Sequence, residues 1–184
     1  MIDFSTMKNN SRLNAEQVKD FFDNNPNASV QLTSVTHPNV YGSDQIDYEK
    51  VRWSFDIDGA GYFYVNTKAS NIETKTGGTF NPTVNLMESI LNTWSLPVEE
   101  YIKEKLQPGA DFITKLRQLI NKVAAGAGEG DVFDKVNATN LTLGISSINL
   151  SEFSGNYFIQ NIYFKKASSD NIENSDDDSM DVPF

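Results

Sequence analysis

The sequence predicts a mainly β fold with a helical insertion, an α+β arrangement in which a helical block separates the third and fourth of five strands. Three segments rich in β-branched and aromatic residues alternate in character as half-buried strands do. They span residues 29–37, 49–57 and 61–67. Apolar residues then recur at helical spacing between residues 84 and 123. Two further strand-like segments, 140–150 and 156–166, close the predicted body.

A short helix is expected before the first strand. Val18, Phe21 and Phe22 fall near one helical face, which can pack on the core. Asn14 stands where the N-cap is needed, and Gln17 follows three residues later as its partner in a capping box. The breaker 24–28 then ends the helix.

The second and third strands form a hairpin across the stretch "DGAG". Alternate residues of the second strand are apolar and must face the core, namely Val51, Trp53, Phe55 and Ile57. A three-residue loop in which Gly59 takes a positive φ pairs Phe55 with Phe63 and Ser54 with Tyr64. An even-numbered loop would instead set the tyrosines over Phe55.

With the odd loop, one outer face collects cationic and aromatic side chains. Cations that follow phosphates and aromatic rings that stack on bases are the means by which proteins hold single-stranded nucleic acid. The candidate residues are Lys50, Arg52, Tyr62, Tyr64, Lys68 and Lys75. The alternative is that these tyrosines only favour a pleated surface. Trp53 is expected in the core, and a register error of one residue would make it the main stacking platform.

The helical block contains three predicted helices. The first covers 84–94, the second starts near Pro97 and ends at Gly109, and Asp111 caps the third. Five strands with a helix between the third and fourth is the layout of the OB-fold, a small five-stranded barrel that binds oligonucleotides and oligosaccharides. The block is long for a minimal OB-fold, so an unrelated α+β arrangement stays open.

No pattern in the chain indicates catalysis, a metal or a cofactor, and we expect a protein that is not an enzyme. There is no cysteine and a single histidine, His37, so the usual zinc sites cannot be assembled. The glycine-rich 126–130 lacks the Gly-Lys-Ser/Thr of a phosphate-binding loop. The absence of cysteine and of any long apolar stretch predicts a cytoplasmic protein without membrane association.

The C-terminal residues 168–184 form a strongly acidic tail. Six of the 25 acidic residues and none of the 15 basic ones lie in 169–184, and the whole chain has a net charge of −10. This composition predicts disorder and sets the domain boundary after residue 167. An acidic run is commonly a solubility device, but such a device does not need the apolar ending of Val182, Pro183 and Phe184.

The ending resembles the C-terminal tip of bacterial and phage single-stranded DNA-binding proteins, an acidic run followed by Asp-Ile-Pro-Phe. The matching residues are Asp176, Asp177, Asp178, Asp181, Val182, Pro183 and Phe184, with Val in place of Ile. The match covers about ten residues, and the long linker of the bacterial proteins is missing. We therefore expect a phage-type protein on a divergent barrel, located in the host cytoplasm, with its oligomeric state left open.

The resemblance implies a protein that coats single-stranded DNA without sequence specificity during replication, recombination and repair. Its tip would recruit a polymerase, helicase, nuclease or recombinase. The ring and terminal carboxylate of Phe184 would enter an apolar pocket beside a Lys or Arg of the partner. The main alternative is a phage virion or scaffold protein whose acidic tail is an assembly peptide, and a small α+β enzyme is a more distant one.

Overall fold

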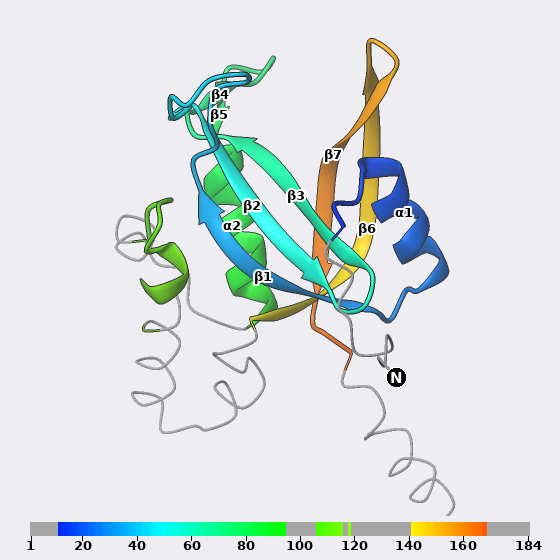
Figure 1. The fold of residues 1–184 in the computed structure, drawn as a ribbon. Coiled ribbons are helices and arrows are strands. Elements are labelled where there is room, and N and C mark those ends of the chain that lie inside the picture. Colours follow the sequence, from blue (N-terminus) through cyan, green and yellow to red (C-terminus); the bar gives the residue numbers. More distant parts are fainter. Residues whose placement is uncertain (1–10, 95–105, 116–117, 119–140, 169–184) are drawn as a thin grey trace, which may run out of the picture.

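Five antiparallel strands form the main sheet of the computed structural model, which describes residues 11–94, 106–115, 118 and 141–168. The strands are β1 (Ser29–Thr36), β2 (Lys50–Ile57), β3 (Gly61–Lys68), β6 (Thr142–Phe153) and β7 (Asn156–Lys165). Their order across the sheet is β3-β2-β1-β6-β7, and every neighbouring pair is antiparallel (Figure 1). The predicted mainly β architecture with five strands and a helix between the third and fourth is therefore confirmed.

A second, two-stranded sheet lies between the third predicted strand and the helical block, where the sequence predicts no strand. It pairs β4 (Ile72–Glu73) with β5 (Thr79–Phe80). Two hydrogen bonds between Thr74 and Gly78 stabilise the turn. The Thr74 hydroxyl accepts from the Gly78 N–H at 3.0 Å, and the Thr74 backbone N–H donates to the Gly78 carbonyl at 2.7 Å. Two residues on each side are too few to show alternation, which is why the pattern did not predict these strands.

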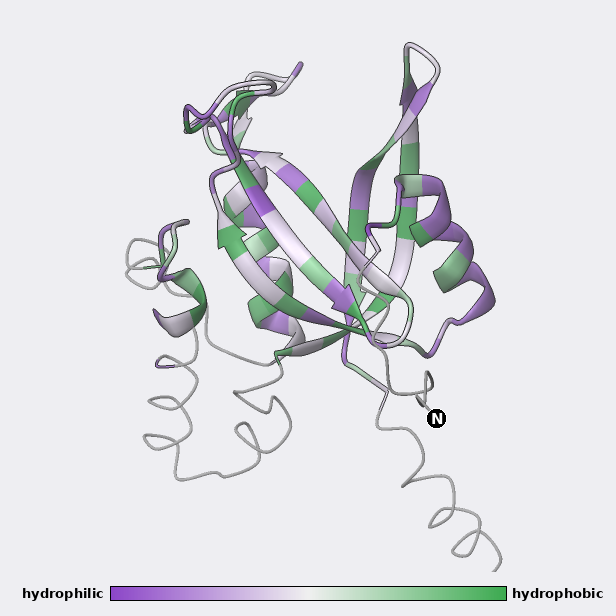
Figure 2. Cartoon of the chain, viewed as in Figure 1, coloured by the Kyte–Doolittle hydropathy of each residue, from purple (hydrophilic) through white to green (hydrophobic). Residues whose placement is uncertain are grey.

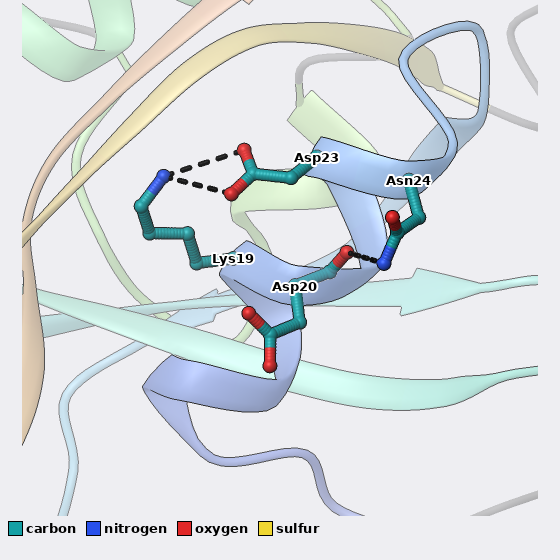
Figure 3. A network of polar contacts seen from close by, with 4 residues as sticks. All are labelled: Lys19, Asp20, Asp23 and Asn24. Atoms are coloured by element: carbon teal, nitrogen blue, oxygen red, sulfur yellow. Dashed lines mark hydrogen bonds and ion pairs between the residues drawn. The ribbon is translucent and has the colours of Figure 1, made fainter.

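Helix α1 (Ala15–Asn24) begins at the predicted capping box. The Asn14 side chain accepts from the Gln17 N–H, and the Gln17 side chain accepts from the Asn14 N–H, both at 2.9 Å. Val18 and Phe22 are buried, whereas the polar side carries the i,i+4 ion pair of Lys19 with Asp23 at 3.0 Å (Figure 3). The helix contacts β6 and β7.

Helix α2 (Pro82–Thr93) lies between the third and fourth strands of the main sheet in the chain. Asn81 caps it by accepting from the Val84 N–H at 3.0 Å, and Pro82 occupies its first turn. It contacts both β3 and β7, the two edge strands of the sheet. The predicted helix 97–109 falls mostly outside the described residues, and a further helix starts at Phe112. Within the described ranges, no helix combines the length and apolar character that a membrane span requires.

The main sheet is strongly curled around its core. Phe55 on β2 and Phe164 on β7 lie three strands apart in the sheet order, which is about 14 Å in a flat sheet. Their ring centroids are nevertheless 5.5 Å apart. Buried residues from the sheet, α1 and α2 form a single cluster inside the curl, and Figure 2 shows the alternation of hydrophobic and hydrophilic residues along β2 and β3. In the described part of the chain, no ladder joins β3 to β7.

Candidate nucleic-acid interface

The β2–β3 hairpin has the register that the sequence predicts. Phe55 pairs with Phe63 and Ser54 with Tyr64, across a three-residue loop in which Gly59 has φ +78°. Trp53 is 1% exposed and is therefore a core residue, as expected. Its indole N–H donates to the Thr67 hydroxyl at 3.0 Å, so the buried polar group is satisfied.

The opposite side of this hairpin, which we call the outer face, carries four cross-strand pairs. In order along the strands they are Lys50–Lys68, Arg52–Asn66, Ser54–Tyr64 and Asp56–Tyr62. Five of the six predicted contact residues thus share one face. The sixth, Lys75, is exposed in the turn between β4 and β5, off this ladder. The face is cationic at the Lys50 end and acidic at Asp56. Tyr64 lies between these two ends, and Tyr62 lies opposite Asp56.

Two lysines stand directly opposite each other at the cationic end of the outer face. Lys50 and Lys68 are exposed and occupy paired positions of β2 and β3. Like charges in this arrangement repel each other, which disfavours the sheet. Lys50 is partly compensated by Asp47, at 3.5 Å from its ammonium group. A bound anion would relieve the repulsion that remains.

Tyr64 lies beneath two arginines. The guanidinium carbon of Arg52 is 3.9 Å from the centre of the Tyr64 ring, and that of Arg12 is 4.4 Å from it. Arg52 belongs to β2, and its Nε also donates to the Asn66 side chain at 3.3 Å. Arg12 lies in a segment that bridges to the edge of β3 facing away from β2. Sequence reasoning missed Arg12, because it precedes the first predicted element and belongs to no periodic pattern.

Backbone hydrogen bonds hold the segment 11–13 against the edge of β3. The Tyr62 N–H donates to the Ser11 carbonyl at 3.0 Å, and the Leu13 N–H donates to the Tyr62 carbonyl at 2.8 Å. The approach is close enough that a Cβ on Gly61, which has φ +135°, would collide with the Ser11 carbonyl. Tyr62 itself keeps its side chain 37% exposed on the outer face.

The connection 37–49 between β1 and β2 adds exposed aromatic groups near Arg52. Tyr41 and Tyr48 are both exposed. His37, the single histidine, donates from Nδ1 to the Lys50 carbonyl at 2.7 Å, which ties the two ends of this connection together. Residues 39–44 and Arg52 border an open surface hollow of about 590 Å³. The arginine therefore faces a space that a ligand can enter.

The long β6–β7 hairpin carries further exposed aromatic residues that the sequence analysis did not single out. Its tip is the two-residue turn Ser154–Gly155, in which both residues have positive φ. The exposed rings are Phe153, Tyr157, Phe158 and Tyr163. The register sets Phe158 opposite Ser151 and Phe153 opposite Asn156, on the side away from the core, and Tyr157 on the other side. Figure 1 shows this hairpin extending to a free tip.

The predicted partner-binding residues, 176–184, lie outside the described residues. Comparisons of the chain with protein-family models, with curated proteins and with solved structures found no match. The interface described above and the sequence of the tail therefore carry the functional conclusions.

Proposed function

We propose that the chain is a single-stranded DNA-binding protein that coats DNA without sequence specificity through the outer face of β2–β3. One observation carries this proposal: four cationic side chains and two tyrosines lie on one exposed face. The cations are Arg12, Lys50, Arg52 and Lys68. In a chain of net charge −10, such a local reversal of charge marks a surface for an anionic ligand.

The fold supports the proposal through its strand order. Numbered along the main sheet alone, the order is 3-2-1-4-5, with a helix between strands three and four. A barrel of the OB type has this order when its third and fifth strands come together, and it presents strands two and three to oligonucleotides. The curl that brings Phe55 against Phe164 and the contact of α2 with both edge strands favour such a barrel.

The chemistry of the outer face suits a sequence-tolerant binder. Cations contact phosphates, which are the same at every nucleotide, and the exposed ring of Tyr62 can stack on any base. The exposed aromatic groups of 37–49, and Phe153 and Phe158 of the β6–β7 hairpin, would extend the stacking surface on either side. The proposed role is binding and not catalysis.

The acidic tail supplies the second half of the proposed function. We assign to residues 176–184 the recruitment of replication and recombination proteins, as the resemblance of this tip implies. Phe184 would enter an apolar pocket, and the upstream carboxylates would raise the association rate at a basic rim. Because the negative charge is concentrated there, the tail can also compete with DNA for the cationic face.

The test is a titration of a fluorescent thymine oligonucleotide with the full chain at several salt concentrations. We expect binding to single strands that weakens steeply as salt rises, and little binding to duplex DNA of the same length. A virion or scaffold protein would show no such binding. Equal affinity for single strands and duplex would also count against the proposal, since duplex bases cannot stack on Tyr62.

A further inference from the structure

We propose that Arg12 and Arg52 form one phosphate-binding site, and that Tyr64 positions their guanidinium groups instead of stacking on a base. The inference rests on the proposed function and adds to it a residue outside the β2–β3 hairpin. It also gives the two tyrosines different roles: Tyr64 positions the arginines, and Tyr62 stacks on a base.

The first argument is geometric. The two guanidinium carbons lie 3.9 Å and 4.4 Å from the centre of the same ring. The arginines approach it from the two segments that flank β3, namely β2 and residues 11–13. An aromatic ring attracts each cation and lowers the cost of holding two positive charges close together. With cations at this distance, the ring of Tyr64 has little surface left for a base.

The second argument is that the part of the chain that the structure describes places no carboxylate partner beside either arginine. Among the described residues, neither Arg12 nor Arg52 forms an ion pair with a carboxylate. By contrast, Lys19, Lys50 and Lys115 each have one. Two guanidinium groups without a carboxylate partner in the described ranges are suited to the non-bridging oxygens of a phosphodiester, which they can bind through parallel hydrogen bonds.

The third argument is that the position of Arg12 is fixed before any ligand arrives. Hydrogen bonds to β3 hold the residues on both sides of it, and the capping box of α1 begins at Asn14 directly afterwards. A side chain on a backbone held in this way loses less entropy when it binds. Arg12 is exposed and can therefore reach a ligand on the outer face.

The test measures how the affinity for a thymine oligonucleotide depends on salt, using the full chain. Each phosphate neutralised on a single strand contributes about 0.7 to the slope of log K against log salt. We expect the double variant Arg12→Gln with Arg52→Gln to lower the slope by about 0.7, and each single variant to lose most of the affinity that the double variant loses. Two independent phosphate contacts would lower the slope by about 1.4, which would refute a shared site.

Three further variants and one matched control separate charge from structure. Arg12→Lys keeps the charge and should keep the slope while lowering affinity, because an ammonium group lacks the planar fork. Tyr64→Leu should lower the slope although it removes no charge, whereas Tyr64→Phe should not. Lys19→Gln is the matched control, since it removes a cation that Asp23 already neutralises (Figure 3), and it should leave the slope unchanged.

The outcomes distinguish the two proposals. If the wild-type chain binds the oligonucleotide and Arg12→Gln leaves the affinity unchanged, the shared site is wrong and the proposed function stands. If the wild-type chain does not bind, both are wrong. A variant that loses binding together with its cooperative thermal unfolding is replaced by Arg12→Lys. Lower affinity of Arg12→Lys at an unchanged slope supports the shared site, and wild-type affinity refutes it.

Discussion

The strongest prediction compares two neighbouring residues of β3 whose side chains point to opposite faces. Tyr62 is 37% exposed on the outer face, whereas Phe63 is 1% exposed and stacks on Phe55 with 5.2 Å between ring centroids. Changing each to Ala should therefore damage a different property. Tyr62→Ala should weaken binding of single-stranded DNA, and Phe63→Ala should destabilise the fold.

The magnitudes follow from these positions. Loss of a buried Phe leaves a cavity and costs about 3–5 kcal/mol of unfolding free energy. Loss of the exposed Tyr62 side chain should cost under about 1 kcal/mol, since its backbone bonds to segment 11–13 remain. Loss of one stacked base costs about 1–3 kcal/mol of binding free energy, so affinity should fall by roughly 5- to 150-fold.

Denaturant unfolding and oligonucleotide titration by fluorescence anisotropy measure the two quantities. Tyr157→Ala is the matched control. It removes an exposed tyrosine from the side of β7 that is opposite to the side carrying Phe158. Its affinity should stay near that of the wild type. If Tyr62→Ala binds as tightly as the control, or if it unfolds as readily as Phe63→Ala, the assignment of the outer face is refuted.

Three other predictions concern the edge of β3, the lysine pair and the tail. Gly61→Ala should lower the melting temperature, because φ is +135° there and the new Cβ would collide with the Ser11 carbonyl; calorimetry showing an unchanged melting temperature would contradict the close approach. Lys68→Glu should raise the unfolding free energy by about 0.2–1 kcal/mol through a cross-strand pair with Lys50, yet weaken DNA binding. If denaturation and titration show the unfolding free energy and the DNA affinity changing in the same direction, the lysine pair is not functional. Deletion of 176–184 should leave or strengthen DNA affinity and abolish capture of host replication proteins in a pull-down; loss of DNA binding would place part of the DNA site in the tail.

Part of the interface could be predicted from sequence because the β2–β3 hairpin follows simple rules. Alternation identified Trp53 and Phe55 as core residues, and a three-residue loop fixed which residues pair. The capping box likewise identified Asn14 as the N-cap of α1. In each case the signal lies in neighbouring residues, so a single sequence is enough to detect it.

The rest could not be predicted, because it depends on contacts between distant segments. Arg12 reaches Tyr64 through a bridge between residue 12 and β3, some fifty residues later in the chain. Two register shifts between β6 and β7 change which side chains share a face, so alternation alone cannot place Phe158 or Tyr163. The curl of the sheet depends on packing such as that of Phe55 on Phe164.

The most direct test of the central claim is to map where a bound single strand lies. An oligonucleotide in which iododeoxyuridine replaces thymidine can be crosslinked to the full chain by light, and mass spectrometry then identifies the attached residues. We predict crosslinks to Tyr62 and to exposed aromatic residues of 37–49 or to Phe153 and Phe158 of the β6–β7 hairpin, all suppressed by high salt. Crosslinks confined to α2 or to the 106–115 segment, or none at all, would contradict a DNA-binding face on β2–β3.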